Sequence, residues 1–221
     1  MVETDGMDLM SRTNLVDLYQ DIELELPSCP QPVILRQVHK TIREFCEETL
    51  AWQGDADPVN VREGVSLYEL TGPDNQAEIV QFKEVWRRYA ADEDLVLLAP
   101  PLYNSNGVLI NGGWERISRC QIGLVSEPDS SVKHGLEIIV ALRPKMTAVS
   151  ICTELYDRWQ EVWACGVKGV LMMMPKKKWT DQAMGQFYHK LWLDGKADAR
   201  IDQLRGGTLG DFVALPKEVF A

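Results

Sequence analysis

Two amphipathic segments separated by a short basic break, within residues 153–205, constrain the fold of this chain most strongly. In the first segment, apolar residues recur at three- and four-residue spacing from Leu155 to Leu171, which is typical of one buried helix face. Pro175 ends this helix, and a second apolar stripe runs from Met184 to Trp192. Because a short turn joins the two segments, we expect them to pack as an antiparallel helical hairpin.

Residues at the starts of these helices and two glycines inside the first helix indicate further features of the hairpin. Thr153 stands at the expected N-cap of the first helix, with Glu154 in its first turn, and Thr180 stands at the expected N-cap of the second. Gly166 and Gly169 interrupt the first helix, at a cost of about 1 kcal/mol each relative to alanine. We therefore expect these two glycines to admit a close neighbour.

Another helix is predicted over residues 33–52, with Pro32 in its first turn. Glu44, Glu47 and Glu48 lie off its apolar face, and we interpret them as a solvated rim rather than as paired catalytic acids. The apolar face itself follows helical spacing and is formed by Ile34, Val38, Ile42, Phe45 and Thr49.

Helical periodicity disappears between residues 54 and 150. Short β-type runs alternate there with turn signals, a pattern typical of an antiparallel sandwich or barrel. The clearest strands are Leu67–Leu70 and Gly135–Val140. Residues Ile79–Arg87 also fit a helix, but the neighbouring strands favour a strand there as well.

The sequence thus predicts an α+β fold in which helices from both ends of the chain form one antiparallel bundle. The predicted bundle domain comprises residues 14–53 and 151–205, and the inserted β-sandwich or barrel domain comprises residues 54–150. Residues 206–221 are expected to form an extended C-terminal arm that begins with a glycine-rich stretch, Gly206, Gly207 and Gly210. The arm needs a partner surface, either the chain's own β domain or another subunit, because it carries five large apolar side chains: Phe212, Val213, Leu215, Val219 and Phe220.

Other candidate partner-binding residues are aromatic or basic. Trp159 and Trp163 lie four residues apart on one helix face, and we expect at least one of them at a subunit or helix–helix contact. Lys176, Lys177 and Lys178 form a basic run. This run either complements the carbonyl end of the preceding helix or forms an ion-pairing patch for an acidic partner or DNA phosphates.

Composition excludes several classes of protein. The formal net charge of −10 speaks against a general nucleic-acid-binding surface. The sequence shows neither a stretch of about 20 apolar residues nor a signal peptide, so we expect a soluble protein made in the cytoplasm without membrane contact. The five cysteines are scattered without CxxC spacing, and we expect free buried thiols.

The sequence predicts no catalytic, cofactor or metal site. His39, His134 and His189 have no second ligand at the usual metal-binding spacing. Phosphate-binding glycine loops, nucleophile elbows and zinc-protease motifs are missing as well. An enzyme would have to be a hydrolase with a dispersed site, in which an imidazole lies beside a carboxylate or a thiol.

Two parts of the chain resemble one protein family. The order ALRP (141–144), LYDRW (155–159), GVKGVLMMMPKKKWTD (166–181) and FYHKLWLDG (187–195) resembles the C-terminal half of head-to-tail connector (tail adaptor) proteins of tailed bacteriophages. The stretch LELPSCPQPVILRQVHKTIREFCEETLAW (24–52) resembles the opening of the same family.

The resemblance implies a virion structural protein of the neck, made in the host cytoplasm and without enzymatic activity or a cofactor. It implies a homo-oligomeric ring, typically twelve-fold, between the portal protein and the tail nozzle or tail tube proteins. The helices would line a channel that genomic DNA crosses without sequence-specific binding, and the arm would run against the portal. Another neck or tail completion (stopper) protein is the alternative, although the long helical hairpin favours the connector.

Overall fold

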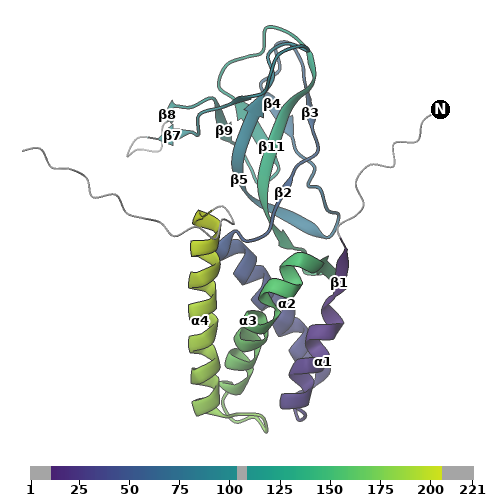
Figure 1. The fold of residues 1–221 in the computed structure, drawn as a ribbon, viewed down its shortest axis with the longest axis vertical. Coiled ribbons are helices and arrows are strands. Elements are labelled where there is room, and N and C mark those ends of the chain that lie inside the picture. Colours follow the sequence, from purple (N-terminus) through teal and green to yellow (C-terminus); the bar gives the residue numbers. More distant parts are fainter. Residues whose placement is uncertain (1–10, 104–108, 206–221) are drawn as a thin grey trace, which may run out of the picture.

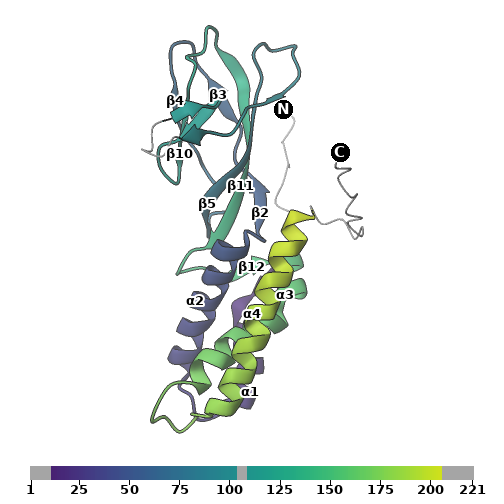
Figure 2. The ribbon, with the colours of Figure 1, turned by 90° about the vertical axis from the view of Figure 1, so that its left-hand side faces the viewer.

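The computed structural model describes residues 11–103 and 109–205, which form a mixed α+β protein. Within these residues, four helices gather at one end of the molecule, and short antiparallel sheets form the other end (Figures 1 and 2). The predicted α+β class and the antiparallel pairing of the strands are therefore confirmed. The predicted arm, residues 206–221, lies outside the described residues.

The helices lie on both sides of the main strand region in the sequence. Their bounds are α1 (Leu15–Glu25), α2 (Gln31–Thr49), α3 (Thr153–Met172) and α4 (Gln182–Leu204). In space, α3 packs on α4, α2 contacts both of them, and α1 contacts α2 and α3. None of the helices in the described part of the chain has the length and apolar character needed to cross a membrane.

The strands are short, except for two. Their bounds are β1 (Arg12–Asn14), β2 (Gln53–Asp55), β3 (Val59–Val61), β4 (Leu67–Glu69), β5 (Ala77–Arg87), β6 (Val96–Leu97), β7 (Leu102–Tyr103), β8 (Leu109–Asn111), β9 (Trp114–Arg116), β10 (Gln121–Leu124), β11 (Val132–Pro144) and β12 (Ser150–Cys152). The two long strands, β5 and β11, form an antiparallel ribbon that rises from the helices (Figure 1). The strand predicted over Ile79–Arg87 is thus confirmed as part of β5.

Two sheets share the strand end of the molecule. The larger has the order β2-β11-β5-β6, and β3 also pairs with β11. The smaller has the order β4-β10-β9. At the base, β1 pairs with β12 and ties the segment before α1 to the start of α3. The predicted domain limits at residues 53/54 and 150/151 fall inside β2 and β12, so the backbone crosses between the two ends of the molecule within strands.

Helix α2 forms where its apolar periodicity predicts it, although it ends earlier, at Thr49. Pro32 occupies the first turn, where the missing N–H costs no intrahelical hydrogen bond. Leu50 ends the helix with a left-handed backbone, at φ 56°. The predicted apolar face is covered by the rest of the chain, and its fully buried members are Ile34, Val38, Ile42 and Phe45.

The N-caps of α3 and α4 differ from the prediction by one residue. Cys152 precedes α3 as its N-cap, and the Thr153 hydroxyl instead accepts a hydrogen bond from Thr13 of β1 at 2.9 Å. Asp181 caps α4 through its side chain, whereas the Thr180 hydroxyl donates to a carbonyl of the preceding turn. The hydroxyl of each threonine is hydrogen-bonded to a residue outside its own helix. The N-cap is therefore the adjacent residue, Cys152 for α3 and Asp181 for α4.

The predicted close approach at two glycines of α3 is confirmed. A Cβ on Gly169 would come within 2.9 Å of the backbone nitrogen of His189 on α4. A Cβ on Gly166 would meet Thr41 at 2.7 Å and the Trp192 ring at 2.8 Å. All three distances are far below a normal carbon contact, so these helices can pack this closely only because glycine has no side chain.

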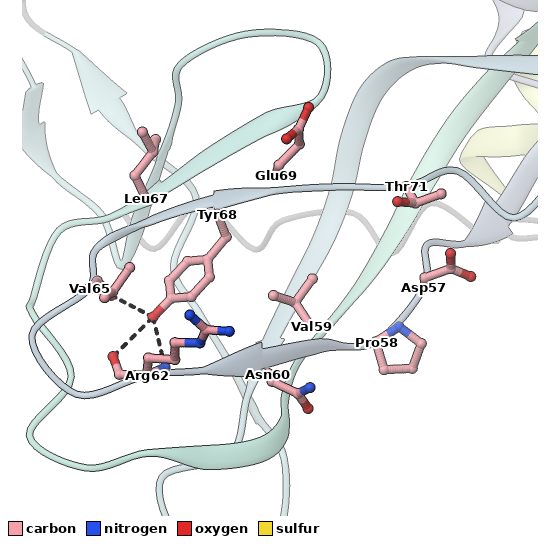
Figure 3. A pocket seen from close by; sticks show the side chains of 10 residues that line it. All are labelled: Asp57, Pro58, Val59, Asn60, Arg62, Val65, Leu67, Tyr68, Glu69 and Thr71. Atoms are coloured by element: carbon pink, nitrogen blue, oxygen red, sulfur yellow. Dashed lines mark hydrogen bonds between the residues drawn. The ribbon is translucent and has the colours of Figure 1, made fainter.

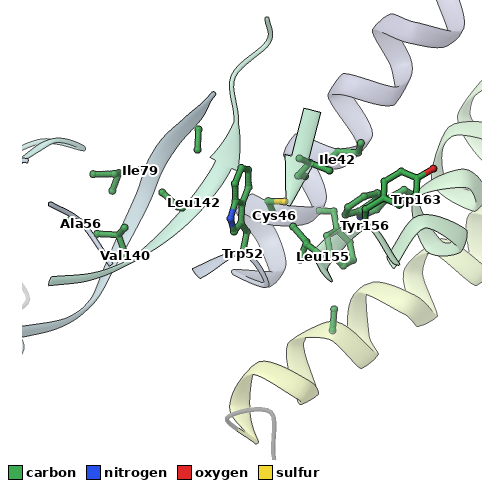
Figure 4. Close-up of a cluster of buried hydrophobic side chains, with 14 of the residues drawn as sticks. Ile42, Cys46, Trp52, Ala56, Ile79, Val140, Leu142, Leu155, Tyr156 and Trp163 are labelled. Carbon is green, nitrogen blue, oxygen red and sulfur yellow. The ribbon is translucent and has the colours of Figure 1, made fainter. Parts of the chain in front are cut away.

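The buried side chains form one connected cluster that runs from the helices into the sheets. Trp52, which follows α2, lies between Cys46 on the helical side and Leu142 on the strand side (Figure 4). Its side chain is 4% exposed. Trp52 therefore links the packing of the helical end to that of the strand end.

Candidate partner-binding surfaces

The predicted basic patch, Lys176, Lys177 and Lys178, lies in the turn between α3 and α4, at the end of the helices farthest from the strands (Figure 1). All three side chains are exposed. The ammonium group of Lys177 lies 6.0 Å from the centre of the Trp179 ring. The patch is thus accessible to a partner, and it also lies near the carbonyl end of α3, where positive charge is favourable.

The two predicted tryptophans lie at a contact between helices of the same chain. Trp163 is completely buried, and its ring centre lies 5.8 Å from that of Phe45 on α2. Trp159 is half-buried, 5.4 Å from the same Phe45 ring. Trp163 therefore has no exposed surface to offer a partner, and we assign it to the core. Trp159 keeps an exposed edge.

The predicted arm residues cannot be placed in the same way. Phe212, Val213, Leu215, Val219 and Phe220 lie outside the described residues. The last described residue is Arg205, directly after α4. Just before it, the Gln203 side chain is hydrogen-bonded to the side chain of Gln53, the first residue of β2. The arm thus starts at the junction between the helical end and the strand end.

One flank of α4 is apolar and exposed, which the sequence interpretation did not anticipate. Met184 is 40% exposed, Phe187 53% and Leu191 40%. The sequence interpretation placed these residues in the same stripe as Trp192, but only Trp192 is buried, with its ring centre 5.8 Å from that of Phe45. The apolar sector of α4 is wider than the surface that α2 and α3 offer it, so its edge remains uncovered.

The same flank becomes acidic toward the end of α4. Asp194 follows Leu191 by three residues and Asp198 follows Asp194 by four, so both continue the same stripe of the helix. Both side chains are exposed, and neither forms an ion pair within the described part of the chain. Together, the exposed residues of this stripe define a surface that we call the α4 flank: Met184, Phe187, Leu191, Asp194 and Asp198.

A buried lysine joins α4 to α2. Lys196 is 6% exposed, and its Nζ lies 3.0 Å from a carboxylate oxygen of Glu44 and 3.0 Å from one of Glu48. The ammonium group also lies 4.9 Å from the centre of the Trp192 ring. Glu44 and Glu48 are therefore not a purely solvated rim, as the sequence interpretation held. The available signal was Lys196 itself, four residues after Trp192 on the buried face of α4.

A second buried lysine joins α3 to the end of α1. Lys168 Nζ donates to Glu25 at 2.9 Å and lies 4.3 Å above the ring of Tyr188. The Tyr188 hydroxyl donates to the other Glu25 oxygen at 2.9 Å. Burial raises the pKa of the Glu25 carboxyl, but the hydrogen bonds from Lys168 and Tyr188 lower it more, so this pKa lies below its usual value.

A third polar cluster joins α2 to the β5–β11 ribbon. Arg143 on β11 donates to Glu78 on β5 at 2.9 and 3.1 Å, and to Glu47 on α2 at 2.5 Å. Arg43 on α2 donates to Glu78 at 3.3 Å. Burial raises the pKa of Glu78, but the hydrogen bonds from Arg143 and Arg43 outweigh burial and lower it. Glu47 is thus also paired, contrary to the solvated rim that we predicted.

A pocket separates β3 from β4 at the strand end (Figure 3). At one end of the pocket, the Asp57 amide donates to the Thr71 carbonyl at 3.1 Å. At the other end, the Tyr68 hydroxyl hydrogen-bonds to Arg62 and Val65. Between these points no ladder joins the two strands, both of which lie in the described part of the chain. We call this gap the β3–β4 seam.

The histidines and cysteines do not form a reactive cluster. Among the described residues, the buried Nδ1 atoms of His39 and His189 have no hydrogen-bond partner, and no group of three or more histidine, cysteine or acidic residues could hold a metal ion. Burial and the nearby charge of Arg43 lower the pKa of His39. Burial also raises the thiol pKa, which keeps the sulfur protonated and unreactive, at Cys29, Cys46 and Cys165.

No protein-family model matches this chain, and no curated protein matches it. The sequence resemblance and the surfaces described above are therefore the grounds for a functional proposal.

Proposed function

We propose that this chain is a virion structural protein, the subunit of a connector ring that joins the portal of a tailed bacteriophage head to the tail. The observation that carries the proposal is the α4 flank. Met184, Phe187 and Leu191 form an exposed apolar stripe on a helix that packs against α3 and α2. An apolar stripe of this kind is typical of a surface that another protein covers.

In this proposal the four helices act as one bundle built from both ends of the chain. The buried ion pairs support this arrangement, because Lys168 and Lys196, which follow the strands, pair with Glu25 and Glu44, which precede them. A bundle held in this way would present the α4 flank in the same orientation in every copy. A closed ring requires such a repeated orientation.

The partner of the α4 flank in this proposal is a neighbouring copy of the chain. The flank would contact a different surface of that copy, because head-to-tail contacts of this type close into rings. The resemblance to connector proteins supplies the expectation of about twelve copies and of a DNA channel. The net charge of −10 supports such a channel, since an acidic wall repels DNA and lets it slide.

The other predicted surfaces have separate roles in the proposed ring. The exposed lysines at positions 176–178 lie at the far end of the helices, where they would meet acidic groups of a neck or tail partner. The arm, residues 206–221, would contact the portal in the assembled particle through its apolar side chains. Both proposed contacts would lie in the neck of the virion.

A charge placed in the α4 flank tests the proposal. Leu191→Asp introduces a carboxylate among the exposed apolar residues, whereas Leu193→Asp introduces the same group on the other side of the same helix, at a position 48% exposed. We expect both variants to keep the circular dichroism spectrum and melting temperature of the wild type. Only the Leu191 variant should fail to form rings on portal-bearing heads in electron micrographs. Normal rings of that variant would exclude the α4 flank as the subunit contact.

The enzyme alternative gains no support from the imidazole groups. A dispersed hydrolase site needs a histidine coupled to a carboxylate or a thiol. In the part of the chain that the structure describes, the Nδ1 atoms of His39 and His189 are buried without such a partner. A stopper protein would share the neck location, and the long helical hairpin favours the connector over it.

A further inference from the structure

The β3–β4 seam leaves two strand edges facing each other. β3 pairs through one edge with β11, where Val59 lies opposite Leu136 and Val61 opposite Val132. β4 pairs through one edge with β10. In the described residues, neither strand has a ladder on its other edge, and these two edges line the pocket of Figure 3. Unpaired strand edges are templates for an added strand.

The backbone groups of β4 that face the seam follow from its pairing with β10. The Ser66 carbonyl and the Leu70 amide, at the two ends of β4, each form a 2.7 Å hydrogen bond to the β10 side. Successive residues of an antiparallel strand direct their N–H and C=O groups to opposite sides. The N–H and C=O groups of Leu67 and Glu69 therefore point into the seam.

The seam also offers apolar surface to an added strand. Leu67 is 51% exposed and Val65 is 37% exposed. The ring of Tyr68 crosses from β4 toward Arg62 and forms part of the wall (Figure 3). A strand in the seam would thus gain hydrogen bonds from the backbone and cover side chains that are otherwise in contact with water.

A segment of the same chain starts close enough to reach the seam. The hydrogen bond between Gln203 and Gln53 holds the end of α4 at the start of β2, the strand that leads to β3. From Gln53 to Asn60 of β3 is seven residues, and from Arg205 to Phe212 is also seven residues. Seven extended residues span about 23 Å. Residues that follow Arg205 can therefore run beside β2 and place residue 212 level with β3.

The sequence at this distance has the features of a short strand. Residues 212–215 read Phe-Val-Ala-Leu, four consecutive apolar residues, which is long enough to pair along the three residues of β4. Pro216 follows, and proline ends a strand because it has no N–H to donate. The glycines at 206, 207 and 210 would allow the chain to turn away from α4.

We propose that the β3–β4 seam is a strand-binding site, and that residues 212–215 of the same chain occupy it in the free subunit by pairing with the open edge of β4. The added strand covers Val65 and Leu67 and extends the β4-β10-β9 sheet toward β3. This proposal goes beyond the proposed function and holds whether or not the chain is a phage protein. In a connector, the arm would have to leave the seam before the same side chains could contact the portal.

Amide hydrogen exchange of the full chain tests this proposal at individual positions. The variant is Val213→Pro, which removes one N–H and blocks strand pairing at that position. The matched control is Val219→Pro, which makes the same change outside residues 212–215. We expect slow exchange of the Leu67 and Glu69 amides in the wild type and in the control. In the Val213 variant, both amides should exchange at least about tenfold faster, while the amides of the β5–β11 ladder stay unchanged.

Two results would overturn the proposal. If the Leu67 and Glu69 amides exchange at the same rate in the wild type and in the Val213 variant, residues 212–215 do not occupy the seam. If their protection in the wild type disappears on dilution, the strand comes from another copy and not from the same chain. Protection that is independent of concentration and lost only in the Val213 variant supports the proposal.

Discussion

The helical end and the strand end of this protein differ in how completely the described residues pair their charged groups and their backbone hydrogen-bonding groups. At the helical end, even the buried charges of Lys168 and Lys196 have carboxylate partners from other helices. At the strand end, the described residues leave the facing edges of β3 and β4 without a ladder and leave Leu67 51% exposed. We therefore expect single side-chain losses to cost more stability at the helical end than at the seam. Binding is then expected where each end is incomplete, at the α4 flank and at the β3–β4 seam.

The largest expected effect is the loss of a core side chain at the helical end. Trp163→Ala removes a completely buried indole that packs against Phe45 and Tyr156. We expect a loss of about 3–5 kcal/mol in the free energy of unfolding, measured by denaturant titration. Leu67→Ala at the seam should cost no more than about 1 kcal/mol, because Leu67 is 51% exposed among the described residues and only the proposed added strand would cover it. Equal losses of unfolding free energy in the two variants would contradict the proposed difference between the helical end and the seam.

A smaller effect is expected from a buried lysine. Lys196→Met keeps most of the length of the side chain but removes the ammonium group that Glu44 and Glu48 share, and Glu48 keeps its ion pair with Arg200. Because these carboxylates are 51% and 39% exposed, water replaces part of the interaction, and we expect a loss of about 1–2 kcal/mol. Lys83→Met, at an exposed position of β5, is the matched control and should be nearly neutral. Similar melting temperatures for both variants would contradict a stabilising role of Lys196.

The smallest expected effect is the pH dependence of the stability that Glu78 contributes where α2 meets the β5–β11 ribbon. The folded-state pKa of Glu78 is lowered, so its interaction with Arg143 and Arg43 stabilises the protein above the unfolded pKa of about 4.3. This contribution is lost as the pH falls through the lower, folded-state pKa. Glu78→Gln should therefore melt below the wild type at pH 7, and the difference should shrink with increasing acidity. A difference that is constant from pH 7 to pH 3 would show that the charge of Glu78 does not matter.

Local periodicity predicted the main elements, because it reflects burial on one face. Helix α2 was predictable from Ile34 to Phe45, and the close approach at Gly169 was predictable from two glycines within one apolar stripe. The β5 strand was ambiguous by itself, and its neighbours decided it correctly. For α2 and for the glycines of α3, the information lies within about 20 consecutive residues, the length over which a helical pattern repeats.

The candidate surfaces were harder to predict, because they depend on residues far apart in the chain. Periodicity grouped Leu191 with Trp192, and only the positions of α2 and α3 decide which of them is covered. Glu44 is 152 residues from Lys196, so the sequence alone gave no reason to pair them. The seam likewise requires knowing that β3 and β4 pair with different strands.

The central claim is that the α4 flank assembles copies of this chain into a ring. Native mass measurement of the purified full chain over a range of concentrations tests it most directly. We predict a single large species whose mass is a fixed multiple of 25.0 kDa, and its loss in the Leu191→Asp variant but not in the Leu193→Asp variant. A wild-type protein that remains a 25.0 kDa monomer at every concentration would contradict the claim.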